Sequence, residues 1–247
     1  MDDNVHSGHR ERLRKQYEVS GLDGFSDHNV LEYILFAAIP YKDTNLIAHK
    51  LIKRFGSLAG VLEAPVSELI LIDGIKTIAA LHIKSYLDVS RRYQIDKSGK
   101  DTILNSTEKA GNYIKTAFHG IADERTYLTT LDAKKKMINH TLICEGTVNA
   151  TNVNMRKIMH IALASNAVAV ILSHNHPSGL ALPSIEDMKT TIKVKKLLLE
   201  MGITLEDHII VVDDDYISFA QSNLLDEQHV MSKIKAAEEP YKNSILT

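Results

Sequence analysis

The chain has 247 residues, of which 44% are hydrophobic and 24% charged, enough to bury the core of one large domain or two modest ones. A formal net charge of −2 excludes a whole-protein attraction to nucleic acid or to anionic membranes, and a single cysteine excludes an intramolecular disulfide and a cysteine-based zinc site. No apolar run approaches the roughly 18 residues that a membrane span needs. Because the start Met1-Asp2-Asp3 also lacks the basic and apolar features of a signal peptide, we expect a soluble, cytoplasmic protein with no membrane partner.

Residues 1–95 are predicted to form a small helical domain, because apolar side chains recur along them at helical spacing. The expected helices are 10–20, a helix that Asp27 caps, 44–55, a short helix that begins at Pro65, and 79–93. The polar segment 96–102 has few apolar side chains and is predicted to be a linker.

Residues 103–222 show a mixed pattern that predicts an α/β domain around a central mixed sheet. We expect strands at 125–131, at 137–144, from 167 into His174, at 209–212 and at 216–219. We expect helices at 106–118 with Ser106 as the cap, at 154–165 and at 185–201. The charged tail, 223–247, is predicted to be partly helical.

A possible metal site lies where the third of these strands ends. His174 and His176 are separated by one residue, so their side chains are expected to point the same way. Pro177 then forces a loop, and Ser184 opens a helix whose first turn carries Asp187 back toward the histidines. Two imidazoles and a carboxylate leave the fourth position of a tetrahedral zinc open to water, as in catalytic zinc sites. The pattern therefore predicts one Zn²⁺ per chain.

Each part of this pattern also has a purely structural explanation. Ser184 and Asp187 have the form of a capping box, and the helix dipole favours an acid in a first turn. A His-x-His at the end of a strand is often two hydrogen-bonded, half-buried rings. We favour the metal site because all three groups converge on one loop.

His-x-His-Pro, six residues, Ser, two residues and Asp is the motif of the JAMM/MPN metallopeptidases. The chain matches this motif position by position at His174, His176, Pro177, Ser184 and Asp187. The resemblance implies a JAMM/MPN fold, which is cytidine-deaminase-like, at 103–222. It also implies zinc-dependent hydrolysis of a peptide or isopeptide bond in a peptide or protein substrate whose identity the sequence does not give.

The chain also resembles the bacterial RadC family, over nearly its whole length from Ser7 onward. The resemblance rests on His-Asn-His-Pro-Ser-Gly at 174–179 and on Asp-His-Ile-Ile at 207–210. The chain departs from the family at 154–157, where Asn-Met-Arg-Lys replaces the usual His-Pro-Arg-Glu and reverses one charge.

In JAMM enzymes, a glutamate at the start of the strand after the first helix takes a proton from the zinc-bound water and delivers it to the leaving amine. The resemblance gives this role to Glu124, since Asp123 would point to the opposite face of the strand. Glu145, at the end of the next strand, is the competing candidate. The resemblance also gives Ser184 the role of stabilising the oxyanion, although its hydroxyl cannot fully do this and cap the helix in one conformation.

Residues 71–79 resemble the hairpin of a helix-hairpin-helix module, in which backbone N–H groups hold a phosphate of DNA. Gly74 and Lys76 are the candidate contacts, with Lys76 at the place of the usual second glycine. Residues 1–95 contain twelve Lys/Arg and twelve Asp/Glu, so no net basic field supports DNA binding.

Two hypotheses remain open: a zinc hydrolase, or a DNA-associated or protein-docking factor with a structural or vestigial metal site. The sequence does not indicate an oligomeric state.

Overall fold

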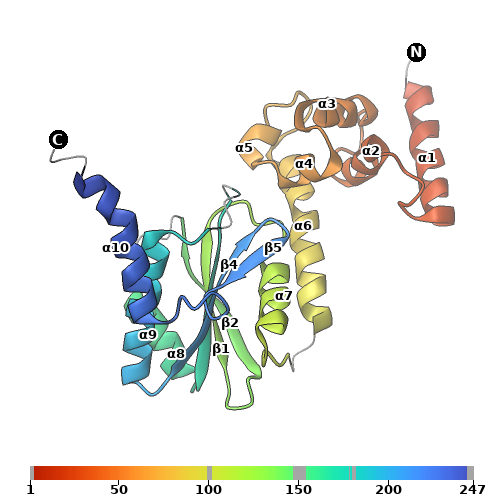
Figure 1. Cartoon of the computed structure of the whole chain (residues 1–247). Coiled ribbons are helices and arrows are strands. Elements are labelled where there is room, and N and C mark those ends of the chain that lie inside the picture. Colours follow the sequence, from red (N-terminus) through yellow and green to blue (C-terminus); the bar gives the residue numbers. More distant parts are fainter. Residues whose placement is uncertain (1–2, 99–101, 147–153, 178, 180–181, 244–247) are drawn as a thin grey trace. The chain divides into compact units, whose positions relative to one another are not determined.

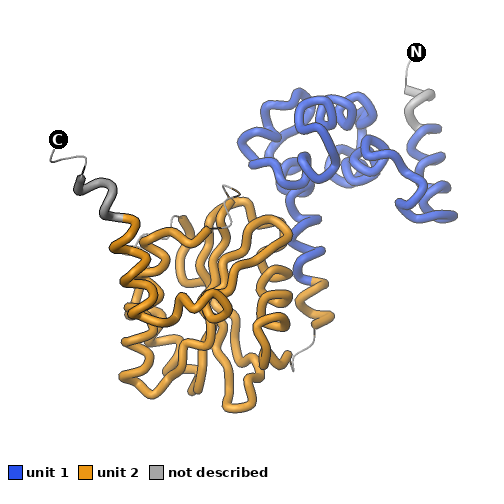
Figure 2. The backbone as a smooth tube through the Cα atoms, viewed as in Figure 1, with its two compact units in different colours: residues 1–92 blue, residues 93–247 orange. Residues whose placement is uncertain are grey.

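The computed structural model (Figure 1) describes residues 3–98, 102–146, 154–177, 179 and 182–243. The chain divides into two compact units, unit 1 at residues 1–92 and unit 2 at residues 93–247 (Figure 2). The division falls inside helix α6 (Thr77–Ser98). Part of the segment that we expected to be a linker therefore continues a helix, because no glycine or proline interrupts the chain before Gly99.

Unit 1 consists of helices around one apolar core. Besides the first part of α6, these are α1 (Asp3–Ser20), α2 (Asp27–Ala38), α3 (Asn45–Phe55), α4 (Leu58–Glu63) and α5 (Val66–Leu69). The core joins α2 to α6 and includes the buried side chains of Leu31, Leu35, Leu51, Val61, Leu69 and Ile83. An apolar cluster confined to this unit indicates that unit 1 has a core of its own.

Two details of unit 1 differ from the prediction. Asp27 is the first residue of α2 and Ser26 is its N-cap, so Asp27 does not cap the helix. Its carboxylate instead accepts a hydrogen bond of 3.0 Å from the backbone N–H of Leu58 in α4. The sequence does not predict α4, because its 6 residues are too few to show a helical repeat.

Unit 2 is an α/β domain with a mixed sheet, as predicted. Its strands are β1 (Arg125–Leu131), β2 (Met137–Glu145), β3 (Ala169–Asn175), β4 (Thr204–Val212) and β5 (Asp215–Ser218). They lie in the order β2-β1-β3-β4-β5, in which β3 and β4 run parallel and the other neighbours antiparallel. The helices are α7 (Thr107–Phe118), α8 (Met155–Ala164), α9 (Ile185–Glu200) and α10 (Glu227–Asn243). Ser106 is the N-cap of α7, and its hydroxyl accepts from the N–H of Lys109, which confirms the predicted cap.

Alternating side chains of the central strands divide between two apolar layers. Ile171 of β3 packs with residues of α7, whereas its neighbour Leu172 packs with residues of α8 and α9. Figure 1 shows the same division, with α7 on one face of the sheet and α8, α9 and α10 on the other. His174 continues the series of Leu172, so its side chain lies on the face that α9 covers. Among the described residues, no helix combines the length and apolar character needed to cross a membrane.

Candidate metal centre

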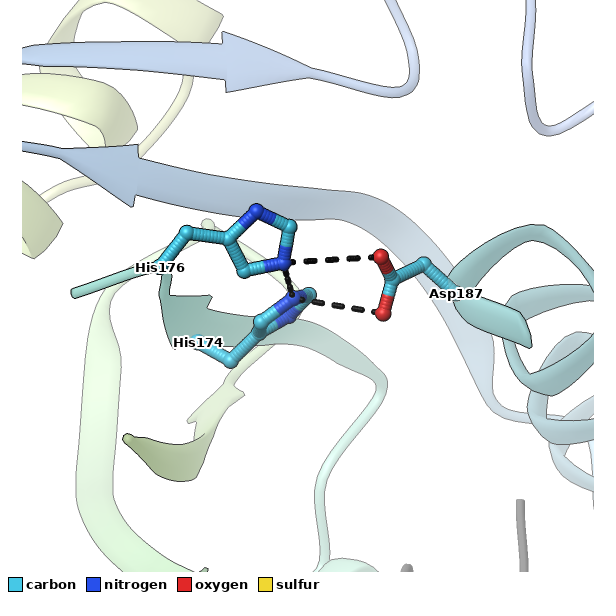
Figure 3. Close-up of side chains that lie close together, drawn as sticks. All are labelled: His174, His176 and Asp187. Atoms are coloured by element: carbon cyan, nitrogen blue, oxygen red, sulfur yellow. Dashed lines mark hydrogen bonds and ion pairs between the residues drawn. The ribbon is translucent and has the colours of Figure 1, made fainter. Parts of the chain in front are cut away.

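His174, His176 and Asp187 meet where β3 ends and α9 begins (Figure 3). The Nε2 atom of His174 lies 2.9 Å from Nε2 of His176 and 3.3 Å from Oδ1 of Asp187. The Nε2 atom of His176 lies 3.5 Å from Oδ2 of Asp187. The spacing of two along an extended chain turns both imidazoles to one side, and the first turn of α9 brings the carboxylate to them. The convergence that the sequence predicts is therefore present.

The N-terminus of α9 fixes the orientation of the Asp187 carboxylate toward the histidines. The backbone N–H and the hydroxyl of Ser184 both donate to Oδ2 of Asp187, at 2.8 and 2.6 Å. In return, the N–H of Asp187 donates to the Ser184 hydroxyl at 3.1 Å, which completes a capping box. Because Oδ2 already accepts two hydrogen bonds, Oδ1 is the oxygen presented to His174. The capping box and the metal site are thus one arrangement, not alternatives.

The cluster is almost completely shielded from water. His174 is fully buried, Asp187 is 1% exposed, and the side chain of His176 is 16% exposed. Burial raises the pKa of Asp187, but the contacts with His174 and His176 outweigh burial and hold the pKa well below its ordinary value. The two hydrogen bonds that Ser184 donates to Oδ2 also stabilise the ionised carboxylate, whichever nitrogen of each imidazole carries the hydrogen.

This donor set fits a zinc ion. Zinc binds imidazole nitrogen and carboxylate oxygen at about 2.0–2.2 Å, so the ligand atoms around a tetrahedral ion lie roughly 3.3–3.5 Å apart. The separation of 3.3 Å between Nε2 of His174 and Oδ1 of Asp187 lies in this range, and the 2.9 Å between the two Nε2 atoms is shorter by a few tenths of an ångström. Two neutral imidazoles and one carboxylate would supply three protein ligands and leave a fourth position for water.

Strand pairing separates the two candidate glutamates. Thr126 of β1 pairs with His174 of β3, so alternation continued to Glu124, the residue just before β1, would place its side chain on the face that carries the histidines. The backbone carbonyl of Glu124 accepts a hydrogen bond of 2.8 Å from Gly146 N–H, which extends the β1–β2 ladder to this residue. Glu145 pairs with Arg125 and forms an ion pair with it at 3.3 Å. Since Arg125 alternates with Thr126, this ion pair belongs to the opposite face of the sheet.

Asn175, between the two histidines, ties the segment that carries Glu124 to the end of β3. Its Oδ1 accepts from the N–H of Arg125 at 2.8 Å, and its Nδ2 donates to the carbonyls of Ile121 and Asp123, at 3.3 and 3.1 Å. No role for Asn175 was predicted from the sequence. A signal was present: a polar side chain between two residues of a buried strand end points to the other face, where it needs hydrogen-bond partners.

Gly74 and Lys76 lie in unit 1, on the turn before α6. Gly74 has φ of +97°, and a Cβ atom there would lie 2.6 Å from Cδ1 of Ile47, so this turn needs glycine. Ile75 is buried in the helical core and holds the turn against it, while the exposed Lys76 immediately precedes α6. The structure therefore brings both candidate contacts to one turn at a helix N-terminus.

Comparison with known families supports the description of unit 2. The family model described as RadC-like JAB domain matches residues 104–224. The matched residues contain the whole sheet, α7, α8 and α9, and therefore all three residues of the cluster. From its fold, its histidine–aspartate cluster and this match, residues 104–224 belong to the family of RadC-like JAB domains.

Proposed function

We propose that unit 2 is a zinc-dependent hydrolase that cleaves a peptide or isopeptide bond. The observation that carries this proposal is the cluster of His174, His176 and Asp187. Membership in the JAB domain family supports it, because the JAMM motif describes metallopeptidases. A peptide or protein is the proposed substrate, and zinc, one per chain, is the proposed cofactor.

The proposed chemistry assigns each residue a task. His174, His176 and Asp187 would hold the ion, which when bound lowers the pKa of a water molecule from about 15.7 toward roughly 7. Glu124 would take a proton from that water and deliver it to the leaving nitrogen. Ser184 can donate to an oxyanion only after its hydroxyl leaves Oδ2 of Asp187, so its first task is to orient that carboxylate.

A peptide-library screen tests this proposal. The zinc-loaded full chain is incubated with a library of unstructured peptides and of isopeptide-linked peptides, and new termini are identified by mass spectrometry. A matched sample receives a chelator in excess. We expect cleavage only in the zinc-loaded sample, because the water needs the ion to ionise near neutral pH. Cleavage that persists at the same rate with the chelator would contradict zinc-dependent hydrolysis.

We also propose a second, independent function for unit 1, which is weak DNA binding at the turn of Gly74 and Lys76. The observation in its favour is that the turn leads directly into α6, whose first N–H groups have no partner within the helix. The balanced charge of residues 1–95 limits the expected affinity to that of nonspecific binding, with Kd of about 10⁻⁴–10⁻⁶ M at physiological salt.

Reversal of the charge at Lys76 is expected to weaken this binding. Gel-shift titration of the full chain on duplex and branched DNA at low salt should show a lower affinity for Lys76→Glu, and added salt should weaken wild-type binding. Lys53→Glu is the matched control, since Lys53 is also exposed in unit 1 but lies in α3. Equal loss in both variants would indicate a diffuse charge effect. No shift of the wild type at low salt would contradict DNA binding and leave protein docking or dimerisation as the proposed role of unit 1.

A further inference from the structure

A chain of buried hydrogen bonds leads away from the ring of His174. The Nδ1 atom of His174 lies 2.8 Å from Nε2 of His208 on β4. The Nδ1 atom of His208 lies 2.6 Å from the hydroxyl of Thr191, and this hydroxyl lies 2.6 Å from the carbonyl oxygen of Asp187, one helical turn earlier. His174, His208 and Thr191 are all fully buried. This series of hydrogen bonds thus begins at the ring of one candidate metal ligand, His174, and ends at the backbone of another, Asp187.

The direction of each hydrogen bond follows from the last link. A carbonyl oxygen only accepts, so the single hydroxyl hydrogen of Thr191 must be donated to Asp187. Thr191 can then only accept from His208, which places a hydrogen on Nδ1 of His208. A neutral His208 has a lone pair on Nε2, and this lone pair must accept from Nδ1–H of His174. His208 is completely buried, and its two ring nitrogens contact only the uncharged hydroxyl of Thr191 and the ring of His174 in this series of hydrogen bonds, so the site favours the neutral ring.

The consequence appears on the other side of the His174 ring. With its hydrogen on Nδ1, a neutral His174 presents a lone pair from Nε2 toward Oδ1 of Asp187 and Nε2 of His176. That lone pair can accept from Nε2–H of His176 in the metal-free site, and together with the carboxylate it gives a buried, electron-rich position that a cation would stabilise. Metal-binding histidines almost always donate their other N–H to a partner that fixes the tautomer and the ring orientation.

We infer that Thr191 and His208 are positioning residues that hold His174 in the tautomer able to bind a metal ion. This inference rests on the proposed metal site and extends it to two residues outside the ligand set. It gives a physical role to the histidine of the Asp-His-Ile-Ile run at 207–210. These two residues would act only by fixing the direction of each hydrogen bond, so Thr191 would affect zinc affinity through its hydroxyl, which contacts the carbonyl of Asp187 and Nδ1 of His208.

Zinc affinity of matched variants, measured by competition with a chromogenic chelator, tests the inference. Thr191→Val removes the hydroxyl at nearly constant shape, and His208→Phe removes the acceptor of His174. We expect each to weaken zinc binding by about 10–100-fold, the usual effect of losing the outer partner of a metal-binding histidine. Thr191→Ser keeps the hydroxyl and should retain wild-type affinity.

The control is Thr190→Val, on the same helix. Thr190 is 1% exposed, and its hydroxyl has no hydrogen-bond partner among the described residues, so its replacement should leave zinc affinity unchanged. Wild-type affinity in both Thr191→Val and His208→Phe would overturn the inference. Equal losses in Thr190→Val and Thr191→Val would also overturn it, because they would indicate a packing effect.

The tautomer of His208 provides a readout that does not depend on zinc. Long-range ¹⁵N–¹H NMR of the zinc-free wild type should show the His208 hydrogen on Nδ1, and Thr191→Val should release this preference. A hydrogen on Nε2 of His208 in the wild type would contradict the inference. If the wild type binds no zinc, the proposed function fails. The spectrum still shows in which direction the hydrogen bonds between Thr191, His208 and His174 run.

Discussion

Replacement of His174 or His176 by alanine is expected to abolish zinc binding while leaving unit 1 folded. Each histidine supplies one of only three proposed protein ligands, and the site lies entirely in unit 2, whereas unit 1 has its own apolar core. Elemental analysis after zinc loading and desalting should give about one equivalent per wild-type chain and close to none in either variant. Circular dichroism should show that the helix content is retained.

The matched control for these variants is His160→Ala, which removes an exposed histidine of α8 in the same unit. It should keep the zinc content of the wild type. The protein must be loaded with zinc before the measurement, because copper and nickel compete for nitrogen and oxygen ligands by their intrinsic affinity and can occupy such a site during purification. Less than about half an equivalent in the loaded wild type, or full occupancy in both histidine variants, would contradict the proposed centre.

Glu124→Gln is expected to retain zinc and to lose hydrolysis. The substitution keeps the shape of the side chain but removes the carboxylate that would carry the proton, so kcat/KM on a cleaved peptide should fall by about 10²–10⁴-fold. Glu124 itself is not among the three clustered ligands, so zinc content should remain that of the wild type. Steady-state kinetics and elemental analysis of the same preparation separate these two effects.

Glu145→Gln is the comparison variant for this second prediction. Glu145 forms an ion pair with Arg125 on the other face of the sheet, so its replacement should leave kcat/KM nearly unchanged. The reverse result, an inactive Glu145→Gln and an active Glu124→Gln, would show that the interpretation of the β1–β3 register is wrong.

The sequence predicted the convergence of His174, His176 and Asp187 because the three residues are close along the chain. A strand end, a proline-containing loop and a helix cap fix where His176 and Asp187 go, and each leaves a local signature. The same holds for Ser106, whose capping of α7 depends on neighbours within one turn. Local sequence patterns are therefore sufficient to predict the three candidate ligands.

The surroundings of the cluster depend on contacts between distant segments. His208 meets His174 only because β4 pairs in parallel with β3, and Thr191 meets His208 only because α9 packs on β4. The strand β4 begins at Thr204, five residues before the predicted start at 209, because the polar run 206–208 interrupts its apolar pattern. The buried His208 belongs to that run. The polar residues that obscure the start of β4 in the sequence therefore include the hydrogen-bond partner of His174.

A crystal structure of the zinc-loaded full chain, with anomalous scattering measured at the zinc edge, tests the central claim most directly. We expect one anomalous peak per chain, bonded at about 2.0–2.2 Å to Nε2 of His174, Nε2 of His176 and Oδ1 of Asp187, with a water molecule as fourth ligand on the side of Glu124. A peak with a fourth protein ligand and no water would indicate a structural site. No peak at the cluster after zinc loading would contradict the proposed zinc site and the hydrolysis that depends on it.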